Sequence, residues 1–335
     1  MQKIKVVTVG LGPIGALITK YLLKKEWVEV VGAIDIAKDL IGKDLGEHLG
    51  VGKLGVTISN DYDKVLSETK PDIAVVATVS YLEKLYPQLE RIIPHGVNVV
   101  STCEELAFPY IINKRLAEKI DALAKKHGVT VLGTGINPGF LMDTLVIALT
   151  TPALEIKSIK VERLIDATKR RGPFQKKIGA GLTVEEFKEA ISKKIISGHV
   201  GLDVSIGLIA SALGWELDKI EVGEVEPVVS DKEVVTPYVK VTPGKVAGLK
   251  QVAKGIVNGE PKITLEFKAY VGAPGEYDAI TIDGTPTIKQ KIEPCVHGDY
   301  GTAGVIINLI PKVIKSPPGL ITMKDVVLPS YIEKF

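Results

Sequence analysis

The sequence predicts an α/β protein, in which a doubly wound parallel sheet is joined to a second, α+β domain built on an open mixed sheet. Three observations predict it. Apolar, β-branched runs alternate with helical segments through the first 138 residues, which is typical of βαβ units. A glycine-rich turn follows the first of these runs. From about Leu154 the runs give way to stretches that alternate between apolar and polar residues, which indicates strands with one solvated face.

The glycine-rich turn separates the first predicted strand, Ile4–Val9, from the first predicted helix, Ala16–Leu23. It has the pattern G-x-G-x-x-G, which in this position is the fingerprint of dinucleotide binding. The glycines allow a tight turn, close approach of a pyrophosphate and close packing of helix on strand. The helix N-terminus offers free N–H groups to phosphate, and proline fits its first turn. The predicted cofactor contacts are Gly10, Gly12, Pro13, Ile14 and Gly15.

A second apolar run, Glu29–Ile34, ends at Asp35, which lies 20 positions after Gly15. An acidic residue at about this spacing binds the adenosine ribose in dinucleotide-binding (Rossmann) folds. Asp35 is therefore predicted to bind the ribose, with a helix N-cap or a solvated turn as the alternative. Its charge repels a 2′-phosphate and favours NAD over NADP, but Lys38 and Lys43 weaken that preference. The predicted cofactor is therefore NAD or NADP.

Composition excludes several classes of protein. The 335 residues allow two domains, and no apolar run reaches the roughly 18 residues of a membrane helix. A net charge of +2, with acids and bases interspersed, predicts neither a nucleic-acid nor a membrane partner. Two cysteines form no disulfide framework and no metal-ligand pattern, so no metal is expected. The N-terminus shows no secretory segment, which predicts a cytoplasmic protein. Abundant lysine, glutamate and β-branched residues are typical of a thermophilic source.

The rest of the first domain continues the alternation. Strands are predicted at Val56–Ile58, Asp72–Thr78, Val97–Val100 and Thr130–Leu132, and helices at Asp61–Leu66, Tyr81–Ile93 and Tyr110–Lys126. Ligands of such sheets bind at the carboxyl ends of the strands. The polar residues that follow two of these strands are therefore candidate cofactor contacts: Thr78, Ser80, Ser101, Thr102 and Cys103. For Ser80 the alternative is an N-cap of the following helix.

The loop Gly133–Phe140 closes this half of the chain with three glycines, a proline and an asparagine. Such a composition marks unusual backbone angles, and the chain is predicted to cross to its second domain here. Asn137 is a candidate contact of the nicotinamide amide, with turn formation as the alternative, and Phe140 is a candidate substrate contact. The predicted domains are a dinucleotide-binding domain over 1–138, a substrate and dimerisation domain over 139–298, and a helix and strand over 299–335 that return to the first domain.

The second domain is predicted to contain both helices and strands. Helices are predicted at Leu141–Leu149, Thr183–Ser197 and His199–Leu213, and strands at Ile156–Ile165, Glu221–Val229, Val246–Val257 and Ile263–Val271. Thr183 and Glu186 have the spacing of a capping box. In the tail, a buried helix is predicted over Asp299–Leu309, ended by Pro311, and a last strand over Val326–Leu328. A homodimer through the open face of the second sheet is expected from the frequency of two-fold assemblies.

Glu104 and Glu105 directly follow the predicted fifth strand, where the nicotinamide end of a dinucleotide is expected. A carboxylate in a partly dry pocket can serve as a general acid or base. Two adjacent carboxylates cannot both point into one pocket, so one is predicted to be catalytic and the other structural, with Glu104 preferred. The alternative is a helix N-terminus with favourable acids. Cys103 has no neighbouring histidine and is interpreted as a small buried thiol rather than a nucleophile.

Other side chains are candidates for binding the substrate. Arg163, Arg170 and Arg171 suit a substrate carboxylate, because arginine binds carboxylates with two parallel hydrogen bonds. A solvated basic face is the simpler interpretation of the last two. His199 is a candidate contact or a cap at the start of its predicted helix, and Thr302 begins the last predicted helix.

Six segments in this order resemble the 2,4-diaminopentanoate dehydrogenases: GLGPIG, GAID, GKDLGE, STCEEL, GTGINPGFLMDTL and DYGTAGVIINLIP. These enzymes are relatives of dihydrodipicolinate reductase, and the group includes native amine dehydrogenases. The resemblance covers both ends of the chain, with STCEEL and INPGFLMD as its specific parts. The chain lacks the histidine pair with a following lysine, and the Pro-Ser-Gly-Thr loop, that dihydrodipicolinate reductases carry, which argues against that activity.

The resemblance implies NAD(P)-dependent oxidative deamination of 2,4-diaminopentanoate or a related small amine, with a ketone and ammonia as products. In that family a glutamate of the STCEEL segment is taken to activate water, which falls on Glu104 or Glu105 here. The amine that is oxidised is on C4, and the amino-acid end is only held. Two alternatives remain. One is another oxidoreductase on the same scaffold, similar to dihydrodipicolinate reductase or homoserine dehydrogenase, and the other is a dinucleotide sensor without activity.

Overall fold

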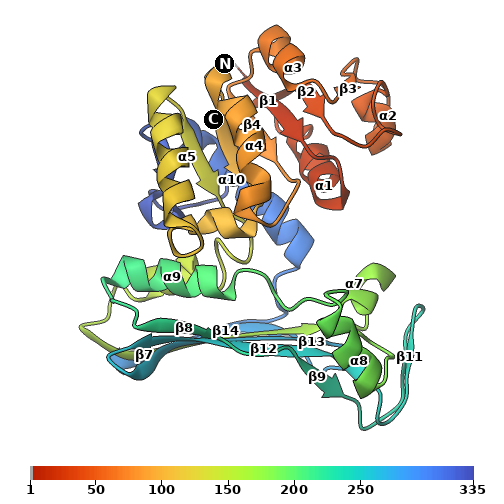
Figure 1. Ribbon diagram of the computed structural model, residues 1–335, viewed down its shortest axis with the longest axis vertical. Coiled ribbons are helices and arrows are strands. Elements are labelled where there is room, and N and C mark those ends of the chain that lie inside the picture. Colours follow the sequence, from red (N-terminus) through yellow and green to blue (C-terminus); the bar gives the residue numbers. More distant parts are fainter. Residues whose placement is uncertain (1–2) are drawn as a thin grey trace. The chain divides into compact units, whose positions relative to one another are not determined.

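The computed structural model describes residues 3–335, and the chain divides into two compact units. Unit 1 comprises the described residues up to Phe140 together with His297–Phe335, and unit 2 is Leu141–Val296. The chain therefore completes unit 2 before its last helix and strand return to unit 1 (Figure 1). No helix within residues 3–335 has the length and apolar character needed to span a bilayer.

Unit 1 is built on a parallel sheet of seven strands in the order β16-β6-β5-β4-β1-β2-β3. Its strands are β1 Ile4–Val9, β2 Val28–Ile34, β3 Ile58–Ser59, β4 Ile73–Val76, β5 Asn98–Ser101, β6 Thr130–Gly133 and β16 Gly319–Ile321. The chain runs from β1 out to β3 on one side and from β4 to β6 on the other. This is the predicted doubly wound sheet, with its switch point between β1 and β4, where such sheets bind ligands.

Helices cover both faces of this sheet. They are α1 Pro13–Leu22, α2 Leu45–Leu49, α3 Tyr62–Thr69, α4 Leu82–Ile92, α5 Lys114–Lys126 and α10 Gly298–Lys315, with 3-10 turns η1 Ile93–His95, η2 Glu104–Ala107, η3 Pro109–Ile111 and η4 Met323–Asp325. Helices α3, α4 and α5 share one apolar core with the sheet, whereas α1 and α2 bury apolar residues in a second cluster. Helix α10 packs beside α1 and against β5. The edge of the sheet that carries the glycine-rich turn is thereby held rigidly.

Unit 2 is built on a mixed sheet in the order β15-β14-β7-β13-β12-β8, with β9 also paired to β12. The strands are β7 Glu155–Asp166, β8 Lys219–Val222, β9 Glu226–Val229, β12 Val246–Val257, β13 Glu260–Tyr270, β14 Tyr277–Thr285 and β15 Ile288–Ile292, and a separate hairpin pairs β10 Val234–Val235 with β11 Lys240–Val241. Only β7 and β13 pair in parallel. The helices are α6 Thr144–Leu149, α7 Gly172–Lys177, α8 Val184–Ser192 and α9 Leu202–Leu213. Helix α9 lies along one face, over β12 and β8 (Figure 1).

Several elements differ from the sequence predictions. The predicted strand Val326–Leu328 is wrong, because the last strand is β16, whose three residues are too few to show an alternating pattern. Pro311 lies inside α10 rather than ending it. Gly223 divides the stretch Glu221–Val229 into β8 and β9. Strands β14 and β15 were not predicted: β14 contains aspartate and glycine, which are rare in strands, and β15 has only five residues. Helix α7 and the hairpin of β10 and β11 were not predicted either. The capping box of Thr183 is confirmed.

Candidate active site

The glycine-rich turn of unit 1 leaves the N-terminus of α1 open for an anionic group. Gly12 is the N-cap, no side chain caps the helix, and no atom lies within 4 Å of the position a Cβ would take there. A Cβ on Gly15 would lie 1.8 Å from the carbonyl oxygen of Gly10, so the helix approaches the turn as closely as only glycine allows. Gly10 itself has a φ of +87°. These features fit the pyrophosphate of a dinucleotide, as predicted for this motif with Pro13 and Ile14.

Asp35 is held at the end of β2 by two backbone donors. The N–H of Leu11 donates to one carboxylate oxygen at 2.6 Å, and the N–H of Ala37 donates to the other at 2.8 Å. The side chain therefore belongs to the glycine-rich turn itself rather than to a helix cap. It lines a cavity of about 460 Å³ together with Gly10 and Gly12. A ribose bound there would meet a fixed, charged acceptor; the ribose role of Asp35 stays a prediction.

The same cavity has a wall from α3 and α4 that was not predicted. Tyr62, Gln88 and Arg91 line it, with the Arg91 guanidinium 4.5 Å from the centre of the Tyr62 ring. Gln88 accepts a hydrogen bond of 3.0 Å from the hydroxyl of Thr78, which is one of the predicted cofactor contacts. In the sequence Gln88 and Arg91 are ordinary polar positions of an amphipathic helix and Tyr62 is a core position of another, so no pattern marks them.

Glu105, not Ser80, caps helix α4. The N-cap position is Tyr81 and no side chain of its own caps the helix, so the proposed capping role of Ser80 is wrong. Instead, the N–H of Leu82 donates to the carboxylate of Glu105 at 2.6 Å, while the N–H of Glu105 donates to the carbonyl of Ser80 at 3.2 Å. This reciprocal pair ties the segment after β5 to the segment after β4. The Glu105 carboxylate is thus engaged by a backbone donor, and which glutamate is catalytic stays a prediction.

Glu104 begins the turn η2 and is half-buried. The segment before it is fixed, since the buried Ser101 hydroxyl donates to the carbonyl of Val76 at 3.1 Å and accepts from the N–H of Cys103 at the same distance. The N–H of Thr102 donates to the same carbonyl at 3.0 Å. Burial, with the nearby charges of both glutamates, raises the pKa of the Cys103 thiol to about 12. Cys103 therefore stays a protonated, buried thiol, as its interpretation from the sequence requires.

The loop after β6 lies beside the start of α10. The N–H of Ile136 donates to the Thr302 hydroxyl at 3.3 Å, so Thr302 fixes the loop that carries Asn137 and Phe140, both half-buried. Thr134, in the same loop, is buried, and its hydroxyl has no hydrogen-bond partner among the described residues. The structure thus brings these polar groups together at the carboxyl edge of the unit 1 sheet, as the prediction for a nicotinamide site requires.

In unit 2, two of the three arginines predicted as candidates for a substrate carboxylate, Arg163 and Arg170, are already bonded to acids. Arg163 is 3% exposed, forms an ion pair with Asp278 and donates to the carbonyl of Val296 at 2.6 Å. Arg170 pairs with Glu276 at 3.0 Å. The Arg163 guanidinium thus lies in the interior with its charge already paired.

His199 lies before α9 rather than in it, because that helix begins only at Leu202. Its ring stacks on Phe267 with 4.6 Å between centroids, and its backbone N–H donates to the side-chain oxygen of Gln251 at 2.9 Å. Burial, helped by the charges of Arg163 and Lys177, lowers the pKa of His199 to about 3. The ring is therefore neutral near pH 7.

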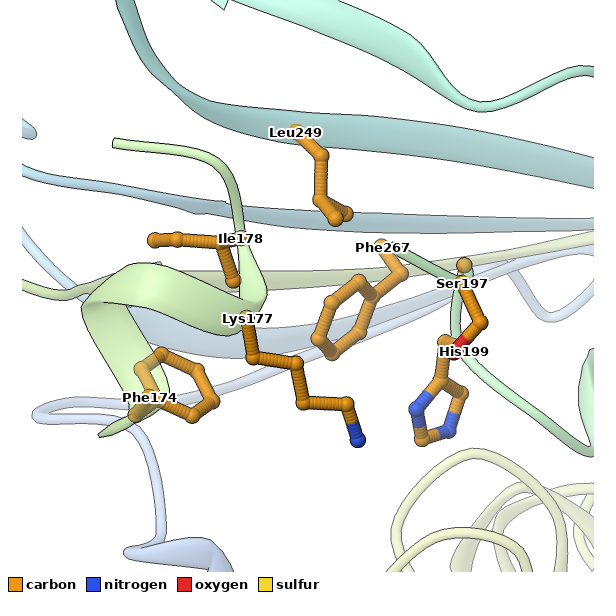
Figure 2. A pocket seen from close by; sticks show the side chains of 8 residues that line it. Phe174, Lys177, Ile178, Ser197, His199, Leu249 and Phe267 are labelled. Atoms are coloured by element: carbon orange, nitrogen blue, oxygen red, sulfur yellow. The ribbon is translucent and has the colours of Figure 1, made fainter. Parts of the chain in front are cut away.

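A small cavity of about 80 Å³ opens beside this ring, and it lies entirely within unit 2 (Figure 2). Its lining residues are Phe174, Lys177, Ile178, Ser197, Gly198, His199, Leu249 and Phe267. Sequence reasoning found only His199 among them, because Lys177 stands in a lysine-rich stretch that shows no pattern. Within residues 3–335 no group of three or more histidine, cysteine or acidic residues could hold a metal ion.

Comparisons with known proteins agree with this architecture. Residues 140–334 match the family model of the 2,4-diaminopentanoate dehydrogenase C-terminal domain, and residues 4–133 match that of the dihydrodipicolinate reductase N-terminus. The chain is 36% identical to 2,4-diaminopentanoate dehydrogenase of Acetoanaerobium sticklandii, over 99% of this chain and 96% of that one.

Solved structures are also similar to this chain. The amine dehydrogenase of Mycobacterium smegmatis is similar with a TM-score of 0.84 and 29% identity, covering 99% of this chain and 98% of that one. A dihydrodipicolinate reductase of Paenisporosarcina sp. TG-14 is similar with a TM-score of 0.55 and 13% identity, over 97% and 100% of the two chains. The latter likeness concerns the fold alone.

Proposed function

The chain belongs to the 2,4-diaminopentanoate dehydrogenase family, and we propose that it oxidises 2,4-diaminopentanoate, or a related small amine, to the ketone with release of ammonia. The reaction is reversible and runs as reductive amination in the other direction. The observation that carries the proposal is the match to a dehydrogenase of that name along nearly the whole of both chains. The carboxylate of Glu104 at the end of β5 supports it.

The nucleotide that unit 1 would hold is NAD or NADP. The open N-terminus of α1 would bind the pyrophosphate and Asp35 the ribose, while Asn137 and the residues after β5 lie at the edge expected for the nicotinamide. When bound, this group supplies the acceptor for the hydride that leaves the carbon bearing the amine. The protein has to position the substrate and manage the protons.

Glu104 is the proposed general base. Loss of a hydride leaves an iminium group on the substrate carbon, to which water adds. Glu104 would take a proton from that water, return it to the nitrogen, and then take the proton of the new hydroxyl group as ammonia leaves, so that the ketone remains. Glu105 is less suited to this task, since its carboxylate accepts the Leu82 N–H at 2.6 Å and so holds α4 in place.

Matched substitutions of the two glutamates test the proposal. We expect Glu104→Gln to lower the turnover of 2,4-diaminopentanoate by roughly 10²–10⁴-fold, with nearly unchanged affinity for NAD or NADP. Glu105→Gln keeps an oxygen that can accept the Leu82 N–H, so its turnover should fall much less. Turnover is measured by the absorbance of the reduced nicotinamide, and cofactor affinity by fluorescence titration.

Three outcomes would contradict these assignments. Full activity of both variants would remove the glutamates from the mechanism. A larger loss in Glu105→Gln than in Glu104→Gln would exchange their roles. If the unchanged protein oxidises no amine but reduces an imine or an aldehyde, the chain is another oxidoreductase on the same scaffold.

The homodimer and the cytoplasmic location predicted from the sequence accompany this proposal. A soluble two-fold assembly is the commonest form of such oligomers. Sedimentation equilibrium of the purified protein measures its oligomeric state. A monomer over the whole concentration range would contradict the predicted homodimer.

A further inference from the structure

The cavity beside His199 in unit 2 combines apolar walls with a single full charge. Among its eight lining residues, only Lys177 carries one, since the His199 ring is neutral near pH 7. The walls come from four apolar side chains: Phe174, Ile178, Leu249 and Phe267. The ammonium group of Lys177 lies on the side of the cavity where His199 stands (Figure 2). An anion that enters would therefore meet one cation, carried by an exposed side chain, beside apolar walls.

The charge of Lys177 is not neutralised within the protein. None of the ion pairs and side-chain hydrogen bonds among residues 3–335 involves it. The neighbouring cation, Arg163, is in contrast paired with Asp278. Some lysines of unit 2 pair with glutamates, as Lys268 does with Glu266, and others do not; Lys177 is distinguished from the other unpaired lysines by lining the cavity. An unpaired cation at the mouth of a cavity is available to a ligand.

The size of the cavity limits what it can take. Its volume of about 80 Å³ corresponds to only two or three groups of water size, at roughly 30 Å³ each. A carboxylate with the carbon that carries it fits, whereas a nucleotide or a sugar does not. The wall is also fixed, because Gln251 holds the backbone of His199 and Phe267 stacks on its ring.

We infer that this cavity binds the carboxylate of the amino-acid substrate, with Lys177 as its cation and the His199–Phe267 stack as its wall. This inference rests on the proposed function, since it concerns the substrate proposed there. It makes Lys177 a specificity residue, which distinguishes an amino acid with a second amine from a simple amine of the same length.

A pair of amines and a pair of lysines test the inference. Pentane-2,4-diamine is 2,4-diaminopentanoate with a methyl group in place of the carboxylate. We expect Lys177→Met to raise the KM for 2,4-diaminopentanoate by about 10–100-fold, as for loss of a hydrogen bond to a charged group, with little change in kcat. The KM for pentane-2,4-diamine should change less than about two-fold. Lys176→Met is the matched control, because Lys176 is the preceding residue of α7 and does not line the cavity; it should alter neither KM.

Calorimetric titration of 2,4-diaminopentanoate into the unchanged protein and Lys177→Met separates this inference from the proposed function. Binding that Lys177→Met weakens, without turnover in the unchanged protein, would sustain the cavity and refute the activity. An unchanged KM in Lys177→Met, an equal rise for both amines, or no binding to the unchanged protein would overturn the inference.

Discussion

The acids at the loops of unit 1 and the buried acid of the unit 2 sheet meet different partners. In unit 1, Asp35 binds two backbone N–H groups, Glu105 binds the one at Leu82, and Asp44 binds several around α2. In the unit 2 sheet, Asp278 meets the side chain of Arg163 within a row of side chains that crosses neighbouring strands, although acids at turns of that unit, such as Glu186, also bind backbone N–H groups. A backbone donor does not depend on residue type, whereas the partner of Asp278 depends on the register of the sheet.

The row in unit 2 crosses four strands in register. Gln251 of β12 stands opposite Phe267 of β13, which stands opposite Arg163 of β7, which stands opposite Asp278 of β14. Residues opposite one another in a sheet share a face. Gln251 and Phe267 hold His199, and Asp278 neutralises Arg163. One row of the sheet therefore supports the wall of the small cavity at one end and buries a charge at the other.

The largest expected effect is the loss of stability when the buried ion pair of that row is broken. Asp278→Ala leaves the Arg163 charge buried without its partner, and we expect the free energy of unfolding to fall by about 3–5 kcal/mol. The side chains of this pair are 3% and 7% exposed. Denaturant unfolding followed by circular dichroism measures the change. Glu221→Gln, which breaks the exposed pair with Lys219, is the control and should have no measurable effect. A similar loss in both variants would mean that the row does not bury its charge.

The next effect tests the acids of unit 1. Asp35→Ala removes the acceptor of two N–H groups and the predicted ribose contact, so we expect the Kd for NAD to rise by about 10–100-fold, with a smaller rise for NADP. Asp44→Ala is the control, since Asp44 also binds backbone N–H groups but lies outside the cavity. Fluorescence titration with both nucleotides gives the affinities. Equal effects on NAD and NADP would show that Asp35 does not contact the ribose.

The separation along the chain of the residues that meet explains which features the sequence could predict. The glycine-rich turn and Asp35 were found because strand, turn and helix follow one another in the chain, and the capping box of Thr183 is local for the same reason. The proposed difference in role between Glu104 and Glu105 depends on the contact with Leu82, which lies 23 positions before Glu105. No local pattern contains that contact, so the sequence could only favour one glutamate.

Sequence patterns could not predict the row of side chains in unit 2. Arg163 suited a substrate carboxylate by its chemistry, but its partner Asp278 lies 115 positions away on β14, a strand that was not predicted. Because that strand was not predicted, the sequence indicated no partner for Arg163, and its charge was interpreted as available to a substrate. Lys177 was missed for the opposite reason, since its isolation from acids is a property of the fold and not of its neighbours in the chain.

The smallest expected effect concerns the pH dependence of stability at the other end of the row. The folded state lowers the pKa of His199 from 6.5 to about 3, so only the unfolded chain takes up this proton as the pH falls below 6.5. The His199 contribution to stability is therefore complete above that pH and declines between about pH 6.5 and about pH 3. In His199→Gln the free energy of unfolding should consequently fall less steeply between about pH 7 and about pH 5. The two proteins should show parallel curves above about pH 7, which controls for changes in packing. Equal slopes at acid pH would mean that the imidazole is solvated and that the stack on Phe267 does not form a dry wall.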